Sequence, residues 1–192
     1  NPITKSTRLG KSACLLVLWL AAACAWGDVV SPLYVGNLVP VLDQYGRPMA
    51  GSNRSADSAA RSRVEVRTPA GGGVQPPAAN GEAHADNPLL ATNAVGGIGQ
   101  NATTTNSGLF CMVFPNRPSP GTKIFARVYN APTLAEASFY ADTAVAMAPA
   151  PTKSSLILTF GAARPLDPGD ADGDGLNNSW EKALGINDRG QA

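Results

Sequence analysis

Acidic side chains recur at alternate positions in one short segment near the end of the sequence. Residues 170–181 read Asp-Ala-Asp-Gly-Asp-Gly-Leu-Asn-Asn-Ser-Trp-Glu. A twelve-residue calcium loop takes its ligands from positions 1, 3, 5, 7, 9 and 12 and has glycine at position 6, where the backbone turns sharply. The segment therefore predicts a calcium site with these ligands: the side chains of Asp170, Asp172 and Asp174, the carbonyl of Leu176, the amide of Asn178 or a water that it holds, and both carboxylate oxygens of Glu181.

The same segment carries the signals of a short helix. Asn178 is a favoured N-cap residue, and Glu181, three residues later, completes a pattern like a capping box. Gly185 stands where helices commonly end in a left-handed residue. The resulting helix, Ser179–Leu184, is too short to be stable alone in water, so we expect the ion and tertiary packing to hold it. Three apolar residues at intervals of four predict an edge that packs on a neighbouring domain: Leu176, Trp180 and Leu184.

The helix that enters the loop in a complete EF-hand is not expected here, because Pro165 and Pro168 occupy the place of its last turn. A loop followed only by an exiting helix resembles the calcium loops of dockerins, of thrombospondin type 3 repeats and of many exported bacterial proteins. This EF-hand-like resemblance covers about residues 165–190 and implies calcium-dependent order. It does not imply cohesin binding, since a dockerin needs two loops. An Asp/Gly-rich surface turn without an ion is the alternative.

A secretory signal peptide is predicted at residues 1–27. A short apolar run, Ser12–Ala25, follows three basic residues and ends in small side chains, which is typical of a processing site after Ala25 or Gly27. The run is shorter than the roughly 20 residues of a membrane helix, so we expect no transmembrane segment in the mature chain. A lipid anchor on Cys24 is the alternative, although a lipobox usually has leucine three residues earlier.

The composition of the chain argues against several classes of protein and site. The net charge is +1, which argues against a nucleic-acid binder. Cys14 and Cys24 belong to the predicted leader, so the mature chain keeps Cys111 alone, without an internal disulfide. We expect Cys111 to be an inert buried thiol, because its neighbours are apolar. One cysteine and one histidine, His84, do not make a zinc site.

Short apolar runs between turn residues predict strands across residues 28–164. In Arg63–Arg67 the alternation predicts that Val64 and Val66 face a core and that the charged residues face water. With no long amphipathic helix, the pattern favours a mainly β domain, an antiparallel β-sandwich of Ig-like or related type, followed at residues 165–192 by the calcium loop and short helix. The expected strands are Leu33–Leu42, Arg63–Arg67, Leu109–Phe114, Lys123–Tyr129, Ser138–Met147 and Ser154–Phe160.

Two long connections separate these strands. Gly71–Asn87 and Asn93–Ser107 are rich in small and polar residues, which indicates surface loops or partly disordered chain able to carry binding. Gly97–Ala102 has the spacing of a nucleotide-binding turn, but no helix pattern follows it, so we interpret it as an ordinary turn. The turn at Asp43–Pro48 resembles the strand-joining turns of carboxypeptidase-regulatory-like and other bacterial Ig-like modules.

Leader, β domain and loop together resemble exported bacterial proteins that end in calcium loops. The resemblance implies a secreted or cell-surface, calcium-stabilised structural or adhesion module, without catalytic activity, whose partner is a surface or matrix protein or a glycan. Because the chain opens on Asn1 rather than Met and stops soon after Asp188, we expect it to be a fragment. Related chains often continue into a second loop at this point, and continuation into a catalytic domain is the alternative.

Two other functions remain as alternatives. The first is an accessory, carbohydrate-binding domain of a larger exported enzyme, suggested by four tyrosines that can stack on sugars: Tyr34, Tyr45, Tyr129 and Tyr140. The second is an enzyme in its own right, for which no Ser/His/Asp set is found. Glu136 and Asp142 are the nearest candidates for a carboxylate pair, although solvated loop and strand positions explain both residues.

Overall fold

The computed structural model describes residues 31–51, 61–69, 71, 73–96 and 107–186. The strands and the Asp-rich segment belong to the same compact unit, which begins at Pro32. The predicted signal peptide, with its processing sites and Cys24, lies outside the described residues, as does the turn Gly97–Ala102. Within the described residues, no helix has the length and apolar composition of a membrane span.

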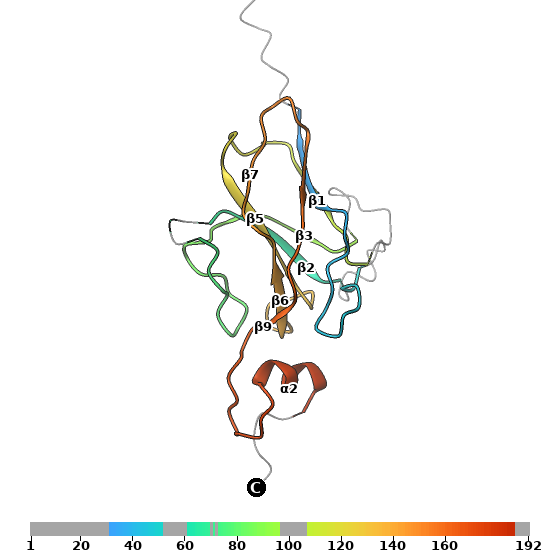
Figure 1. Ribbon diagram of the computed structural model, residues 1–192, viewed down its shortest axis with the longest axis vertical. Coiled ribbons are helices and arrows are strands. Elements are labelled where there is room, and N and C mark those ends of the chain that lie inside the picture. The colour runs from blue at the N-terminus through green and yellow to red at the C-terminus, as the bar shows by residue number, and fades with distance from the viewer. Residues whose placement is uncertain (1–30, 52–60, 70, 72, 97–106, 187–192) are drawn as a thin grey trace, which may run out of the picture. The chain divides into compact units, whose positions relative to one another are not determined.

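The described chain is mainly β, as the sequence predicts (Figure 1). Its elements follow one another in this order: β1 (Leu33–Asn37), β2 (Arg63–Arg67), β3 (Leu89–Ala94), β4 (Cys111–Phe114), β5 (Lys123–Tyr129), β6 (Phe139–Asp142), β7 (Ala146–Met147), β8 (Ser155–Leu158), β9 (Arg164–Pro165) and the helix α2 (Asn178–Leu184).

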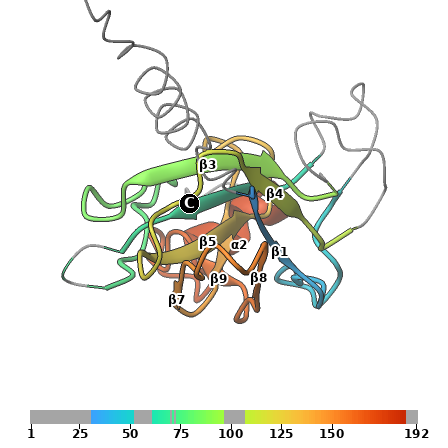
Figure 2. The same cartoon turned by 90° about the horizontal axis from the view of Figure 1, so that it is seen from above.

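The strands form two sheets. The small sheet has the order β4-β1-β8 (Figure 2). The large sheet has the order β3-β2-β5-β6-β9, with β7 paired to β5. Among the strands of the described residues, every pair is antiparallel except one: β1 runs parallel to β8, with Val35 opposite Leu156. The expected all-antiparallel arrangement is therefore wrong at this pair. A parallel pair needs a long connection between its strands, and most of the domain lies between β1 and β8.

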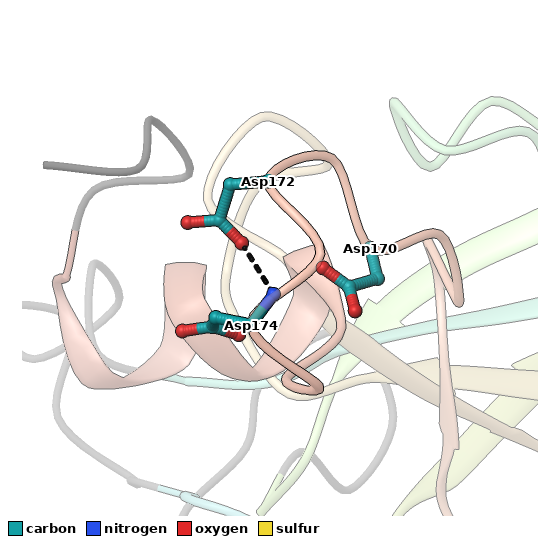
Figure 3. Close-up of side chains that lie close together, drawn as sticks. All are labelled: Asp170, Asp172 and Asp174. Carbon is teal, nitrogen blue, oxygen red and sulfur yellow. Dashed lines mark hydrogen bonds between the residues drawn. The ribbon is translucent and has the colours of Figure 1, made fainter. Parts of the chain in front are cut away.

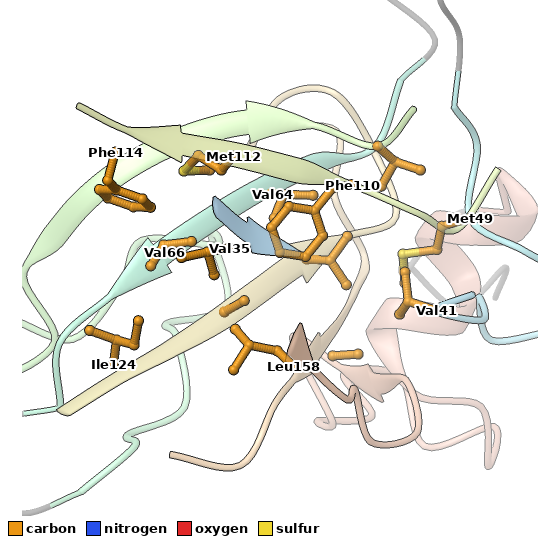
Figure 4. Close-up of a cluster of buried hydrophobic side chains, with 14 of the residues drawn as sticks. Val35, Val41, Met49, Val64, Val66, Phe110, Met112, Phe114, Ile124 and Leu158 are labelled. Carbon is orange, nitrogen blue, oxygen red and sulfur yellow. The ribbon is translucent and has the colours of Figure 1, made fainter. Parts of the chain in front are cut away.

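A single hydrophobic cluster contains side chains from both sheets (Figure 4). Val64 and Val66 of β2 are fully buried in it, so their predicted inward orientation is confirmed. Every second residue of β5 joins the same cluster, because successive strand side chains point to opposite faces. The small sheet contributes the following members: Leu33, Val35, Met112, Phe114 and Leu158.

The opposite face of the large sheet is covered by residues 73–87, which belong to the first long connection. Three side chains of β2 and β5 donate hydrogen bonds to its carbonyl oxygens: Tyr129 Oη to Gly81 (2.9 Å), Arg127 Nη2 to Gln75 (2.7 Å) and Arg67 Nη1 to Asn87 (2.6 Å). Asn87 is itself fully buried and fixes the segment through its side-chain amide. The connection is therefore an ordered cover of the sheet over these residues.

This cover changes the environment of the charged residues in β2. Glu65 is 0% exposed and Arg67 is 8% exposed, so the expectation that the charges of this strand face water is wrong. Glu65 accepts hydrogen bonds from Arg63 Nε (2.7 Å) and Arg67 Nε (2.8 Å). A carboxylate removed from water needs such partners, because an unpaired buried charge is strongly unfavourable.

A second buried ion pair lies on the same covered face of the large sheet. Arg127 of β5 donates from Nε and Nη2 to the two carboxylate oxygens of Asp142 on β6, at 2.6 and 2.9 Å, and Arg164 Nη2 donates to Asp142 at 2.7 Å. Both guanidinium groups also stand over the ring of Tyr140, at 5.0 and 4.8 Å from its centroid. Burial by itself lowers the pKa of Arg127, but the hydrogen bond and the charge of Asp142 outweigh it, so the pKa is raised.

The strand boundaries agree with the sequence where the alternation is uninterrupted. Arg63–Arg67 and Lys123–Tyr129 are strands over the predicted residues. Leu33–Leu42 is a strand only as far as Asn37, whose side-chain amide donates to Val39 O and Gly108 O and turns the chain away. Leu109–Phe114 and Ser154–Phe160 are strands only over Cys111–Phe114 and Ser155–Leu158. Ser138–Met147 divides into β6 and β7, and β3 and β9 were not predicted.

Candidate metal centre

The Asp-rich loop connects the large sheet to the helix. It leaves the sheet at β9 and enters α2 at Asn178. Two glycines in the loop have left-handed backbones, Gly173 (φ 76°) and Gly175 (φ 93°), and nothing lies within 4 Å of the place of a Cβ at either position. A larger side chain would therefore meet no steric clash at either position. Glycine is favoured because φ is positive, and other residues adopt a positive φ only at a cost in free energy.

Three carboxylates meet in this loop (Figure 3). One oxygen from each of Asp170, Asp172 and Asp174 lies within 4.8 Å of the other two; Asp172 is half-buried, and the others are exposed. Oxygens on opposite sides of a calcium ion are about 4.6–5.2 Å apart, given Ca–O distances of about 2.3–2.6 Å. The cluster therefore has the dimensions and the all-oxygen chemistry that a single hard cation requires.

Backbone N–H groups hold each of these carboxylates in place. Asp170 accepts from Gly173 N (2.7 Å) through Oδ1 and from Gly175 N (3.0 Å) through Oδ2. Asp172 Oδ1 accepts from the backbone of Asp174 (3.1 Å), the bond drawn in Figure 3. Asp174 Oδ1 accepts from the backbone N–H of Leu176 (2.7 Å). Each aspartate thus keeps acceptor capacity beyond these bonds, because an ionised carboxylate has about four lone-pair sites.

The other predicted ligands are placed differently. Leu176 and Asn178 are half-buried, and the Asn178 amide oxygen accepts the N–H of Ala171 (3.0 Å). Glu181 is 1% exposed and does not belong to the cluster of three aspartates. The structure therefore brings together the first three predicted ligands, and coordination by Leu176, Asn178 and Glu181 stays a prediction.

The N-terminus of the helix differs from the prediction by one residue. Asn177, not Asn178, is the N-cap; its backbone is extended and its side-chain oxygen accepts from Trp180 N (3.0 Å). Glu181 is therefore not the third residue of a capping box. The side chain of Asn178 is occupied instead, because its amide nitrogen donates to Asp167 Oδ2 (2.9 Å). At the other end, Gly185 has the predicted left-handed conformation (φ 70°).

The helix packs on the β strands through one large residue rather than through a regular apolar edge. Trp180 contacts Phe139 of β6 with a ring-centroid distance of 4.9 Å and Tyr45 with a distance of 5.4 Å, both edge to face. Leu184, predicted to share this edge, is 53% exposed. The buried residues of α2 are Ser179 and Glu181, so the packed side of the helix is polar apart from the indole.

Asp167, which the spacing of the loop residues does not predict as part of the site, lies at the base of the loop. Its carboxylate accepts from Gly169 N (3.0 Å) and from the amide of Asn178, and its backbone N–H donates to Ser179 Oγ (2.8 Å). Asp167 therefore closes the base of the loop by joining its first residues to the start of the helix. The signal that was present is local: Asp167-Pro168-Gly169 has the composition of a turn in which aspartate bonds its own backbone two residues on.

The candidate carboxylate pair of an enzyme is not formed. Asp142 belongs to the buried ion network, whereas Glu136 is exposed and accepts a hydrogen bond from Thr133 Oγ1 (2.7 Å). The interpretation of Asp142 as a solvated residue is wrong as well, since only 9% of it is exposed. Cys111 is half-buried rather than buried, and this partial burial raises the pKa of its thiol.

Comparison of the chain with models of protein families, with curated proteins and with solved structures found no match. The interpretation of the site therefore depends on the loop itself and on what surrounds it.

Proposed function

We propose that the chain is a non-catalytic structural or adhesion module, secreted or held at the cell surface, in which calcium orders the segment that follows the β domain. The observation that carries the proposal is the convergence of Asp170, Asp172 and Asp174, whose carboxylate oxygens lie within 4.8 Å of one another. Three carboxylates at this separation repel one another, and a divalent cation removes that repulsion. Oxygen ligands of this kind are those that calcium prefers.

The affinity expected for such a site is low. The loop has no entering helix, and three of the six predicted ligands are outside the aspartate cluster. We expect a calcium dissociation constant on the order of 10⁻⁴–10⁻³ M, the range of extracellular modules. Magnesium competes weakly, because it requires a smaller octahedral set of ligands. When bound, the ion supplies charge neutralisation and fixes the loop; it takes part in no reaction.

Isothermal titration calorimetry with calcium chloride tests the site. The parent protein should bind one ion, and Asp170→Asn should reduce the affinity more than tenfold, because it removes the charge of one ligand and one of the two oxygens that accept backbone N–H groups. Glu82→Gln is the matched control, since it removes one exposed charge outside the loop. No saturable heat up to about 10 mM calcium, roughly tenfold above the weak end of the expected range, would refute the proposal.

Export is the second part of the proposal, and the sequence of residues 1–27 supports it. Expression with export should yield a mature N-terminus at Trp26 or Asp28, as measured by intact mass. A chain that keeps Asn1 would contradict export by this leader, and a lipid mass on Cys24 would indicate a membrane-anchored protein instead. We also infer that the two sheets pack as a β-sandwich, supported by the one hydrophobic cluster to which both contribute.

An accessory, carbohydrate-binding domain is the second candidate. Two of the four tyrosines that suggested it are buried, Tyr129 and Tyr140, while Tyr34 and Tyr45 are 43% and 45% exposed. Exposed aromatic rings are the feature that favours this alternative. A glycan array tests the carbohydrate-binding function, because a module that recognises only protein gives no glycan signal. Binding that is lost in Tyr45→Ala would select the carbohydrate-binding function.

A further inference from the structure

The indole of Trp180 joins segments that are far apart in the sequence. Its ring meets Phe139 at the start of β6 (4.9 Å between centroids) and Tyr45 in the turn that follows β1 (5.4 Å). We propose that residues 166–186, here called the C-terminal strap, clamp this turn onto the β5–β6 connection, so that opening the strap loosens both segments. The strap is then a conformational element of the β domain and not an independent appendage.

A second contact of the strap reaches the same connection. Lys182 Nζ donates to Ala135 O and to Ala137 O, both at 2.7 Å. These carbonyls belong to the chain between β5 and β6, which forms no strand there. The ammonium group thus supplies donors to backbone oxygens that no strand partner satisfies, and an ionised donor makes a stronger hydrogen bond than a neutral one.

The two segments under the strap also contact each other. Asn130 Nδ2 donates to Gln44 Oε1 (3.3 Å) and to Ser138 Oγ (3.0 Å), and Asn130 Oδ1 accepts the N–H groups of Ser138 and Phe139 (3.0 Å each). Asn130 therefore ties the 43–48 turn to the β5–β6 connection from within. The strap closes over this joint from outside, so a change at Trp180 is transmitted to both segments.

Both ends of the strap are attached to β6 or its flank. At the first end, Leu166 N donates to Ser138 O (2.9 Å), and Leu166 is 5% exposed. At the other end stand Trp180 and Lys182. Between them, the bond from Asp167 N to Ser179 Oγ holds the helix against the start of the strap. Because the strap is fixed at both ends and these ends are joined to each other, we expect it to open as one cooperative unit.

The strap is incompletely packed against the β5–β6 connection, and we expect opening to begin there. A pocket of about 320 Å³, open to solvent and with mostly polar walls, lies between the strap and the β domain. Few apolar contacts and several exposed hydrogen bonds characterise regions that open below the free energy of global unfolding. The pocket walls include, from the strap, Asp167, Asn178, Ser179 and Lys182 and, from the β domain, Ala137 and Ser138.

Hydrogen exchange measured by mass spectrometry tests the strap in calcium-free buffer with chelator. Trp180→Ala removes both aromatic contacts and should speed amide exchange about tenfold or more in residues 43–48 and 130–139 as well as in α2. Lys182→Met removes the two hydrogen bonds but keeps the aliphatic stem, and should speed exchange several-fold in residues 130–139. Leu184→Ala, on the exposed side of the same helix, is the matched control and should change neither segment.

The outcomes separate the strap from a passive tail. Faster exchange confined to α2 in Trp180→Ala, with residues 43–48 and 130–139 as protected as in the parent, would overturn the proposal. If Trp180→Ala loses protection in β1 and β4 too, the variant has unfolded, and Lys182→Met decides: unchanged exchange in residues 130–139 then overturns the strap.

A link between the strap and the ion rests on the proposed function. Since the aspartate loop lies within the strap, calcium should slow exchange in residues 43–48 and 130–139 together with α2. Calcium that binds by calorimetry but slows exchange in α2 alone would contradict this link. Absence of calorimetric binding would refute the calcium site. The exchange rates of the variants and the parent in chelator would then still test the strap, because they do not depend on calcium.

Discussion

Replacing Arg127 by methionine removes the cation at the centre of the buried ion network on the large sheet. The Arg127 side chain is 0% exposed and Asp142 is 6% exposed, and two hydrogen bonds of 2.6 and 2.9 Å join them. Methionine retains much of the apolar volume but none of the donors. In the variant, Asp142 keeps only Arg164, whose side chain is 53% exposed, and the carbonyl of Gln75 loses its donor.

The expected loss of stability follows from this geometry. Breaking a buried ion pair by removing one partner costs about 3–5 kcal/mol, because the remaining charge is left without compensation. For a domain of this size that corresponds to a fall in Tm of about 6–20 °C. The remaining bond to Arg164 keeps the loss toward the lower end of this range. Arg47→Met is the comparison variant, because its pair with Asp43 is solvent-exposed and worth about 1 kcal/mol or less.

Urea unfolding followed by circular dichroism measures both variants against the parent. A third protein, Arg127→Met with Asp142→Leu, replaces the pair by apolar side chains and should be more stable than Arg127→Met alone, since it leaves no uncompensated carboxylate at position 142. The reasoning is refuted if Arg127→Met loses no more stability than Arg47→Met. It is also refuted if the double variant is no more stable than the single one, because uncompensated charge would then not be the cause of the loss.

Two further predictions concern titratable groups. Burial first, and the charge of Glu65 second, raise the pKa of Tyr129 to about 12. The folded protein therefore holds this proton more tightly than the unfolded chain does. The resulting contribution to the free energy of unfolding is complete below about pH 10, and roughly 2–3 kcal/mol of it is lost between about pH 10 and 12. Urea unfolding at a series of pH values checks this, and Tyr129→Phe should lose less stability across that interval than the parent; an equal loss would contradict the assignment. Cys111 should react with a thiol reagent in the native protein, but more slowly than a free thiol at pH 7, because it is half-buried and its raised pKa keeps it protonated. Labelling only after denaturation would mean that the strand β4 shields the thiol fully, and labelling at the rate of a free thiol would mean that it does not shield it.

Local patterns in the sequence determine much of this protein. The alternation of Val64 and Val66 predicts β2 and its buried face, because a strand presents every second side chain to the same side. The spacing of Asp170, Asp172 and Asp174 predicts a loop in which the three carboxylates meet, since a chain that turns tightly aims alternate side chains inward. Both features depend on residues that are close together in the chain.

The choice between neighbouring asparagines shows where local information ends. Asn177 and Asn178 are equally suited to cap a helix. Asn177 is the N-cap in the structure because Asn178 is taken by a partner eleven positions earlier, Asp167, and by the N–H of Ala171. The N-cap was therefore decided by bonds across the loop, which helix propensity does not contain.

Tertiary structure alone decided whether the charged residues of the large sheet are buried. Glu65 alternates with buried valines and reads as water-facing, yet it is fully buried. The reason is that residues 73–87 fold back over that face and exclude water, while arginines on the same strand neutralise the carboxylate. Alternation reports that a strand has two faces; whether the second face meets water depends on a segment distant in sequence, and only the folded chain brings it there.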